Sequence, residues 1–248
     1  MMLGKDFEIV DGYPILYIKS LNALVCSDLH LGYEGVMSEK GAFLPKVNLK
    51  RIKNFIKAAA EQTGADRIIM DGDIKNEFSK VHHEEFNEFK ELVDYLRSDL
   101  GFKRVILVKG NHDNFVDRIN PGLGIEIFAY EALMNGILFF HGEGLPSTQK
   151  FRTLIMGHMH PAIAIYSRLG AKEKLHCFLY GKTKKGAEII VLPAMNYFAN
   201  GVAVNFEEIK GMAQIFGSIA DVRKMEALCI GEGETLDFGT IGQLSRLR

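Results

Sequence analysis

Short apolar runs alternate with amphipathic stretches along the first two thirds of the chain. The runs are rich in β-branched residues, which is typical of buried strands, while the stretches between them have helical periodicity. Strands that alternate with covering helices predict an α/β fold. The expected core strands are Ala23–Cys26, Arg67–Met70, Val105–Val108, Ile137–Phe140 and Leu154–Met156.

Two stretches between these strands predict helices. We expect Asn48 to be the N-cap of the first helix and Gly64 to end it. Its inward face would hold Leu49, Ile52, Phe55, Ile56 and Ala59. The second helix would end before Gly101 and turn inward Phe86, Phe89, Leu92, Val93 and Leu96.

Beyond Pro161 the pattern becomes rich in strands and turns. Lys182–Gly186 is expected to be a turn, and Gly231–Glu234 is typical of the turn of a hairpin. The expected strands are Leu175–Tyr180, Glu188–Leu192, Val202–Val204, Ala227–Ile230 and Thr235–Phe238. The chain has no internal repeat, low-complexity tract or Pro/Ser-rich linker. We therefore expect a single domain over residues 1–248, with a β-rich carboxy-terminal half.

Composition and charge narrow the class of protein. The 248 residues are 47% hydrophobic and include 17 Phe, which is enough for a large buried core. The 30 basic and 31 acidic residues nearly cancel, giving a formal net charge of −1. This balance argues against a protein dominated by non-specific attraction to nucleic acid or membranes, although a local basic rim is compatible with it.

The cysteines and the hydropathy indicate the compartment. Cys26, Cys177 and Cys229 are odd in number and widely spaced, so they form neither a disulfide framework nor a paired-thiol zinc signature. The segment Met1–Val10 lacks the apolar core of a signal peptide. No apolar run approaches the roughly 20 residues that cross a bilayer. We expect a soluble cytoplasmic protein without membrane contact.

Each of the five core strands is followed at once by residues that bind hard or borderline metals. In an α/β sheet, ligand sites form outside the carboxyl ends of the strands, so these segments are expected to converge on one crevice. The segments are Ser27-Asp28-Leu29-His30, Asp71-Gly72-Asp73, Lys109-Gly110-Asn111-His112-Asp113, His141-Gly142 and Gly157-His158-Met159-His160.

The spacing within these segments supports a shared site. Asp28 and His30 are two residues apart, as are His158 and His160, and such pairs point to the same side of an extended segment. Each pair can therefore face one metal or two adjacent metals. The glycines beside the candidate ligands permit the tight turns that aim short side chains inward, namely Gly72, Gly110, Gly142 and Gly157.

Each segment alone also has an ordinary explanation. Asp28-Leu29-His30 occurs by chance in loops, and Gly72-Asp73 is typical of a simple turn. Their combination favours a functional site, because five of the eight histidines lie immediately beyond apolar runs and a chance arrangement would scatter them.

Read in order, the five segments resemble the motifs of the calcineurin-like metallophosphoesterase superfamily. The resemblance covers positions 28–160. More narrowly, the chain is similar to compact archaeal phosphoesterases related to the SbcD-type repair nucleases, and to bacterial DNA-ligase-associated phosphoesterases. The narrower resemblance lies in Ser27–Glu34, Leu192–Ala194 and Gly201–Asn205.

The resemblance implies a fold and a metal centre. The implied fold is a four-layer α-β-β-α sandwich of two mixed β-sheets flanked by helices. One divalent metal would be held by Asp28, His30 and His160, and a second by Asn111, His141 and His158, with Asp73 bridging both. Oxygen and imidazole ligands without thiolate suit Mn²⁺, Fe²⁺ or Zn²⁺. The family makes Mn²⁺ the first choice, with Zn²⁺, Fe²⁺ and Ni²⁺ as alternatives.

The resemblance also implies an activity. His112 would face the substrate as a catalytic residue, and Asp113 would hold its imidazole in orientation. A hydroxide bound to the metals would attack a phosphodiester of a nucleotide or of a DNA or RNA end. The nuclease version comes from the resemblance alone.

Other activities use the same metal pair. A phosphomonoesterase or a cyclic-nucleotide phosphodiesterase would need only a different pocket. A non-enzymatic scaffold, like the retromer subunit with this fold, is a further alternative, against which the intact ligand set and His112 weigh. The sequence identifies no protein partner.

Several residues near the motifs have two interpretations. Asn76 is a candidate for orienting a ligand through a hydrogen bond. The cations that flank the motif loops either steer a phosphate or are ordinary surface charges: Lys75, Lys109, Arg118, Lys150 and Arg152. Four aromatic residues either stack on a base or pack in the core: Tyr33, Phe115, Tyr197 and Phe198.

For four further residues we favour structural roles. His82 and His83 are expected in the solvated first turn of a helix, beside acidic residues that suit the helix dipole. His176 lies within an expected strand, and Cys26 is expected to be a small buried hydrophobic residue.

Overall fold

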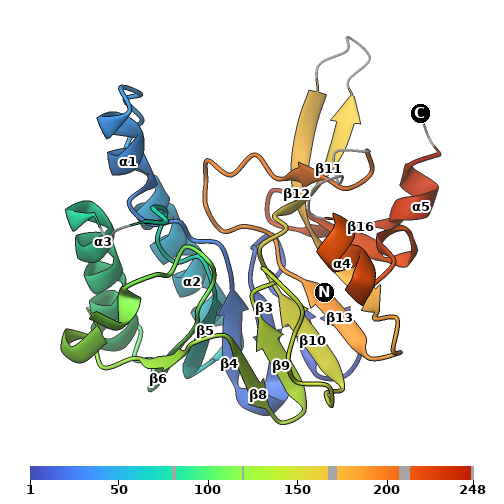
Figure 1. The fold of residues 1–248 in the computed structure, drawn as a ribbon, viewed down its shortest axis with the longest axis horizontal. Helices are drawn as coiled ribbons and strands as arrows, with labels where there is room; N and C mark the ends of the chain where they lie inside the picture. The colour runs from blue at the N-terminus through green and yellow to red at the C-terminus, as the bar shows by residue number, and fades with distance from the viewer. Residues whose placement is uncertain (80–81, 119, 167–171, 207–212, 247–248) are drawn as a thin grey trace.

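Two mixed β-sheets form the framework of the protein (Figure 1). The computed structural model describes residues 1–79, 82–118, 120–166, 172–206 and 213–246. Within these ranges the first sheet has seven strands and the second has nine.

The first sheet is antiparallel in its first half and parallel in its second. Its strands follow one another in chain order, antiparallel up to β4 and parallel from β4 to β7. They are β1 (Met2–Leu3), β2 (Phe7–Ile9), β3 (Leu16–Ile18), β4 (Ala23–Cys26), β5 (Arg67–Asp71), β6 (Arg104–Val108) and β7 (Glu126–Phe128).

The second sheet has a parallel centre with antiparallel pairs on either side of it, and a further parallel pair at one edge, where β14 meets β11. Its order is β14-β11-β12-β13-β10-β9-β8, with β15 paired to β12 and β16 to β15, and the pairs β13–β10 and β10–β9 are parallel. The strands are β8 (Glu131–Met134), β9 (Ile137–Phe140), β10 (Thr153–Met156), β11 (Pro161–Tyr166), β12 (Lys172–Lys182), β13 (Glu188–Val191), β14 (Val202–Ala203), β15 (Glu226–Ile230) and β16 (Thr235–Thr240).

Helices cover the outer face of each sheet, so the molecule has four layers (Figure 1). Beside the first sheet lie α1 (Tyr33–Glu39), α2 (Asn48–Thr63) and α3 (His83–Asp94), the last of which continues into a π-helical turn, η2 (Tyr95–Asp99). Beside the second sheet lie α4 (Ala213–Ile219) and α5 (Ile241–Leu244).

Three hydrophobic cores fill the spaces between these layers. Because side chains of a strand alternate between faces, neighbouring residues of β6 enter different cores. Val105 and Leu107 pack against the helices, whereas Ile106 and Val108 pack between the sheets. In the second sheet, Phe139 points to the central core and its neighbours point to the outer one. The expected α-β-β-α sandwich is confirmed.

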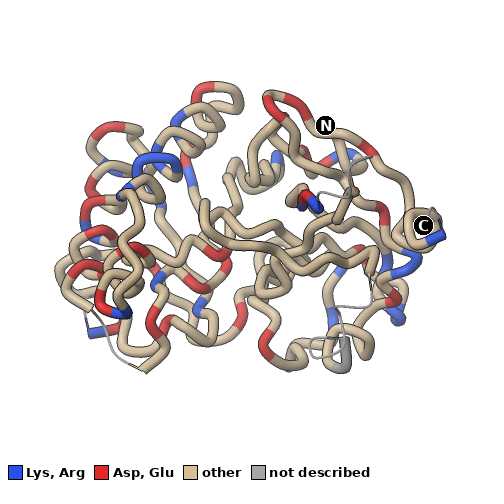
Figure 2. The backbone as a smooth tube through the Cα atoms, turned by 90° about the horizontal axis from the view of Figure 1, so that it is seen from above, with Lys and Arg blue, Asp and Glu red and all other residues tan. Residues whose placement is uncertain are grey.

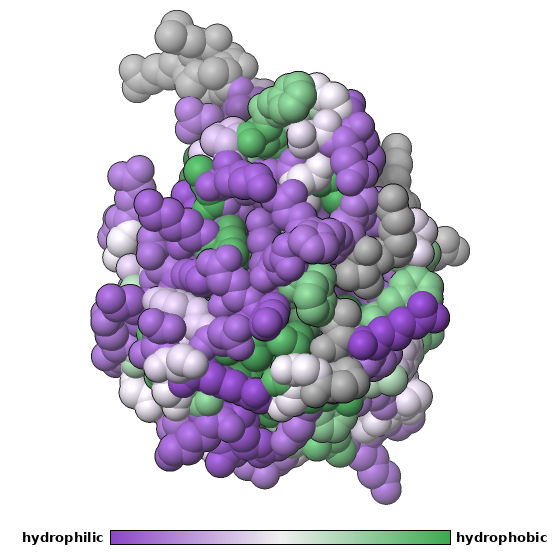
Figure 3. Space-filling view, turned by 90° about the vertical axis from the view of Figure 1, so that its left-hand side faces the viewer, coloured by the Kyte–Doolittle hydropathy of each residue, from purple (hydrophilic) through white to green (hydrophobic). Residues whose placement is uncertain are grey.

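The helix-covered face of the first sheet is mostly hydrophilic, with hydrophobic residues scattered over it (Figure 3). Seen from above, charges of both signs lie mainly on the outer helices and loops and leave the central strands nearly uncharged (Figure 2). Because the basic and acidic residues are nearly equal in number, the formal net charge is only −1. Among the described residues, no helix is long and apolar enough to cross a membrane.

All five core strands form where the sequence predicts them. The predicted strands beyond Pro161 are confirmed too, including the β15–β16 hairpin. The short amino-terminal strands β1–β3, and β7, β8 and β11, were not predicted, nor were the helices α1, α4 and α5.

The predicted N-cap of α2 is wrong by one residue. Val47 is the N-cap, and Asn48 is the first helical residue. The backbone N–H groups of Val47 and Asn48, which have no acceptor within the helix, donate to Glu34 Oε1 at 3.0 and 2.9 Å. A carboxylate of α1 therefore caps α2 and also suits its helix dipole. This arrangement leaves the Asn48 side chain available for other contacts.

Candidate metal centre

The candidate ligands meet where the carboxyl ends of the two sheets lie together. The backbone just after β4 pairs with the backbone just after β13, through a parallel bridge between Ser27 and Ala194. The parallel centres of both sheets therefore deliver their loops to one place, as expected for sites in α/β sheets.

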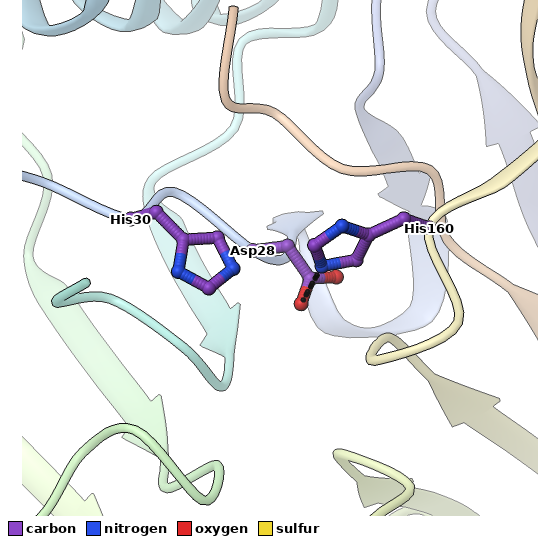
Figure 4. Close-up of side chains that lie close together, drawn as sticks. All are labelled: Asp28, His30 and His160. Atoms are coloured by element: carbon purple, nitrogen blue, oxygen red, sulfur yellow. Dashed lines mark ion pairs between the residues drawn. The ribbon is translucent and has the colours of Figure 1, made fainter. Parts of the chain in front are cut away.

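Two groups of side chains within the described residues have the spacing of metal sites. In each group, one nitrogen or oxygen from each side chain lies within 4.8 Å of the others. The first group is Asp28, His30 and His160, and the second is Asp73, His141 and His158. Figure 4 shows the first group, in which the His30 and His160 rings lie on either side of the Asp28 carboxylate.

The two groups are adjacent, and Asp73 lies between them. Its Oδ2 atom is 3.1 Å from Nε2 of His141 in its own group and 4.0 Å from Nε2 of His30 in the other. Nε2 of His141 is also 3.7 Å from Oδ1 of Asp28. These distances are compatible with two cations that share the Asp73 carboxylate.

Asn111 also presents an unused oxygen. Its Oδ1 atom is buried and has no hydrogen-bond partner in the described part of the chain. The loop that carries it packs closely on the second group, because the backbone N–H of His112 donates to Asp73 Oδ1 at 2.9 Å. A buried amide oxygen without a partner carries a desolvation cost unless something binds it.

The ring nitrogens of the buried histidines are also short of partners. Neither nitrogen of His30 has a hydrogen-bond partner among the described residues, although the side chain is only 10% exposed. Nδ1 of His141 donates to the Asp71 carbonyl at 2.7 Å, because a carbonyl can only accept, and this leaves Nε2 directed at the carboxylates. Such second contacts fix the tautomer of a metal-binding imidazole. The donor set therefore fits divalent cations.

No thiolate contributes to this donor set. Cys26 lies one residue before Ser27, and burial, together with Asp71, raises the pKa of its thiol to about 12. It packs in the core between the first sheet and the helices, as the sequence predicts.

The backbone at the candidate ligands is strained. Five of the eight non-glycine residues with a positive φ in the described chain are candidate ligands: Asp28 (56°), His30 (43°), Asp73 (51°), His158 (66°) and His160 (44°). Each such residue costs about 1–3 kcal/mol and persists only where its surroundings force it. Strain concentrated on the ligands indicates that their positions matter more than local stability.

Glycines give the ligand side chains room. A Cβ on Gly72 would overlap the His141 ring, one on Gly110 would lie 2.6 Å from the same ring, and one on Gly157 would overlap Ser27 Oγ. Gly110 and Gly157 do not have positive φ, so close packing, rather than an unusual turn, requires glycine there. The sequence pattern singles out Gly110 and Gly157, but the predicted reason for them is a tight turn.

Asn48 and Asn196 brace the Asp28–His30 loop from behind. The Asn48 side chain donates to Leu29 O at 3.0 Å and accepts from Tyr197 N at 3.0 Å. The Asn196 side chain donates to Leu29 O and to His30 O, both at 3.2 Å, and its backbone N–H donates to Asp28 O at 3.1 Å. Both asparagines are buried.

Ser27 and the His158 backbone orient the Asp28 carboxylate. Ser27 Oγ lies 2.8 Å from Asp28 Oδ2, and the His158 N–H donates to the same oxygen at 3.1 Å. The other oxygen, Oδ1, is left facing Nε2 of His160 at 2.9 Å. Sequence patterns missed the His158 contact because its partners are 130 residues apart in the chain.

His112 is oriented by a different group from the one expected. Its Nδ1 atom donates to the backbone carbonyl of Asn76 at 2.6 Å, which leaves Nε2 free to face a substrate. Asp113 does not orient this ring: its oxygens accept from Gly110 N at 2.9 Å and Ile74 N at 2.8 Å, and so tie two ligand loops together. Asn76 thus orients a site residue through its backbone, where the sequence suggested its side chain.

Most of the cations expected at the rim are engaged elsewhere. Lys75 is buried and donates to the Glu77 carbonyl, and Lys109 pairs with Asp117 at 2.7 Å. The Arg118 guanidinium lies over the Phe115 ring, 4.6 Å from its centroid. Arg152 donates to a carbonyl of the turn before β9, at Asn135. For Lys150 the structure gives no contact that links it to the site.

Two aromatic side chains near the site are exposed to solvent. Phe78 is 53% exposed and lies edge-on to His112, with ring centroids 5.9 Å apart, and Phe115 is 39% exposed. Tyr33 stacks on Phe198 with ring centroids 5.3 Å apart, so this pair is packed. Phe78 follows the Asp73 loop and was not singled out by the sequence.

Of the remaining histidines, His83 is exposed as the sequence predicts, whereas the His82 side chain is only 11% exposed and its Nδ1 lies 3.1 Å from Glu39 Oε1. His83 is the first residue of α3, and the backbone N–H of His82 donates to Glu85 at 2.8 Å. His176 lies in β12, outside both ligand groups.

Carboxylates and imidazoles shift one another's pKa values. Burial alone would raise the pKa values of Asp28 and Asp73, but the neighbouring imidazoles hold both below the ordinary range. Burial alone would lower the pKa values of His141 and His160, but the same carboxylates raise both. For His30, burial outweighs the carboxylates and lowers the pKa to about 4.

Comparisons with known proteins show the family of this chain. The sequence model of the calcineurin-like phosphoesterase family matches residues 21–181, which is more than half of the chain. The chain belongs to the calcineurin-like phosphoesterase family. It is therefore a metal-dependent phosphoric ester hydrolase, and divalent metals are the cofactors of this family. The matched residues include every candidate ligand.

The solved structure of a nuclease shares the fold. A nuclease named MPE from Pseudomonas putida has a TM-score of 0.61 with this phosphoesterase at 16% identity, covering 92% of this chain and 93% of that one. Yfce, a phosphoesterase from E. coli, has a TM-score of 0.44 at 15% identity, covering 88% and 98%. A search of curated protein sequences gives no match.

We expect metal loading to release protons. The carboxylates raise the pKa values of His141 and His160 and so favour their protonated forms, whereas metals bind neutral imidazole. Apparent affinity for Mn²⁺ should therefore fall as the pH is lowered. Calorimetric titration at one pH, in two buffers with different ionisation enthalpies, measures the proton count. If the measured binding enthalpy is the same in both buffers, no protons are released and the expectation is wrong.

Gly157→Ala should damage the first ligand group. The new methyl group would overlap Ser27 Oγ and lie 2.8 Å from Asp28 Oδ2, so the carboxylate must move. Displacing a group that orients a ligand typically costs about 10–100-fold in metal affinity. Gly217→Ala in α4 is the control, because nothing lies within 4 Å of its new Cβ. Metal content after dialysis measures the effect, with thermal unfolding to verify folding, and full occupancy in Gly157→Ala would refute the packing argument.

Proposed function

We propose that this phosphoesterase hydrolyses phosphodiester bonds of nucleotides or nucleic-acid ends at a two-metal centre. One cation is held by Asp28, His30 and His160, the second by Asn111, His141 and His158, and Asp73 is shared. The observation that carries the proposal is the pair of adjacent ligand groups with Asp73 Oδ2 between them. When bound, two such cations lower the pKa of a water molecule and screen the phosphate oxygens.

The protein's own part in the reaction is to position groups. The strained ligand loops are fixed before substrate arrives, since Asn48, Asn196 and Asp113 hold their backbones. Preorganised groups of this kind need no rearrangement during the reaction. His112 acts as a general acid in its imidazolium form: Nδ1–H stays on the Asn76 carbonyl, and Nε2 gives its proton to the leaving oxygen.

The engaged rim cations favour a diester over a monoester. A phosphate monoester carries close to two negative charges at neutral pH, whereas a diester carries one. Lys109, which would compensate the extra charge, is paired with Asp117. The exposed Phe78 ring beside His112 suits an organic group on the leaving side. The shared fold with a nuclease is in line with this substrate class.

A panel of substrates and metals tests the proposal. We expect hydrolysis of bis-p-nitrophenyl phosphate and of nucleotide diesters to exceed that of p-nitrophenyl phosphate, with Mn²⁺ most effective. The panel includes 2′,3′-cyclic nucleotides, single- and double-stranded DNA, Zn²⁺ and Ni²⁺. A preference for the monoester would reject the diesterase, inactivity on all DNA would reject the nuclease version, and inactivity on every ester would favour the scaffold alternative.

His112→Ala should keep the metals and lose turnover. Loss of a general acid typically lowers kcat by about 10²–10⁴-fold. The loss should be larger for DNA than for a p-nitrophenyl ester, because p-nitrophenolate leaves readily without a proton. His83→Ala is the control, since His83 is exposed at the start of α3. Paired measurements of kcat and metal content decide the role: equal losses on both substrates would argue for a structural role instead.

A further inference from the structure

A cavity lies behind the Asp28–His30 loop. It has a volume of about 590 Å³, within the range of small-molecule sites. Its walls come from the β2–β3 turn, α2, β12, the segment after β13, and the β15–β16 turn. The two turns are joined, since Gly12 N donates to Thr235 Oγ1 at 3.3 Å and a Cβ on Gly12 would lie 2.7 Å from the backbone of Gly233. None of the metal-ligand candidates lines it.

The Arg51 side chain places a positive charge in this cavity without an ion-pair partner among the described residues. Its guanidinium lies over two rings, 4.8 Å from the centroid of Phe55 and 4.9 Å from that of Tyr197. In the described part of the chain the guanidinium forms neither a hydrogen bond nor an ion pair. A guanidinium that is held by aromatic faces and retains its five N–H donors is suited to grip a phosphate.

The same wall offers aromatic surface and a polar group. Tyr197 is 51% exposed, and Tyr13 lies edge-on to Phe55 with centroids 5.2 Å apart. Nδ1 of His176 is buried without a hydrogen-bond partner among the described residues. Rings that accept stacking, a cation and an unpaired ring nitrogen together match an aromatic base that carries a phosphate.

The cavity shares a wall with the metal centre. Asn196 lines the cavity and also donates to the backbone of the Asp28–His30 loop. Tyr197, beside it, donates its backbone N–H to Asn48, one turn before Arg51 on α2. A molecule in the cavity would therefore contact the segment that braces the ligands without touching the ligands.

We propose that this cavity binds a nucleotide, with its phosphate on Arg51 and its base against Tyr197. The nucleotide is either a free mononucleotide or one unit of a strand whose scissile end lies at the metal centre. The choice of a nucleotide among aromatic anions rests on the proposed function. Binding itself requires no hydrolysis, so it can be tested separately.

The test titrates the full-length chain with dAMP by calorimetry, once with Mn²⁺ and once with a chelator. Binding should persist with the chelator, because Arg51 rather than a metal holds the phosphate. Arg51→Ala should weaken it about tenfold or more. Lys50→Ala is the matched control: it removes the same charge from the neighbouring exposed position of α2 and lies outside this cavity.

Two further titrations test where the base binds and whether the nucleotide is free or part of a strand. Tyr197→Ala should weaken dAMP about tenfold but leave ribose 5-phosphate unchanged, since only the base stacks. Tighter binding of a 5′-phosphorylated octathymidylate than of dTMP identifies a strand, and tighter or equal binding of dTMP identifies a free nucleotide.

Two results would overturn the proposal: loss of all dAMP binding with the chelator, or unchanged binding in an Arg51→Ala protein with wild-type thermal unfolding. Neither result depends on the substrate panel. A protein that binds dAMP here but hydrolyses no ester would reject only the proposed reaction.

Discussion

The buried Asp73 carboxylate is the contact on which the site depends. One of its oxygens accepts a backbone hydrogen bond from His112, and the other lies between imidazoles that come from different sheets. A carboxylate that is 2% exposed is costly unless positive charge compensates it, and the surrounding histidines do so only in part because burial opposes their protonation. The glycines, the strained ligands and the bracing asparagines all serve to bring compensating groups to this point.

Much of this arrangement follows from the sequence, because its cause is local. Apolar runs such as Ile137–Phe140 form strands wherever they can be buried, and the polar residues directly after them reach the sheet edge without further information. The layers follow too, since alternate residues of β6 must enter different cores. The strands β1–β3 have only two or three residues each, which is too short for a periodic signal.

The parts that the sequence did not predict depend on distant partners. Asn48 looks like a helix cap from its neighbours alone, but Glu34 takes that role and Asn48 contacts a segment about 150 residues away. Asn196 has no local signal. Asp113 adjoins His112 in sequence, yet its oxygens are used by backbone N–H groups and the ring turns to the Asn76 carbonyl. Likewise, the left-handed backbone at five ligands has no local sequence signal, although Asp and His adopt it more readily than most residues.

Because Glu34 caps α2, three neighbouring segments of the chain hold one another in place. The ligand loop leads into α1, α1 secures the start of α2, and Asn48 of α2 returns to the ligand loop. If the ligand loop, α1 or the start of α2 opens locally, the other two lose the contacts that hold them. Residues 27–48 are therefore expected to exchange their amide protons as one cooperative unit. Whatever occupies the ligand groups then also stabilises a helix that it never touches, by mass action on that unit.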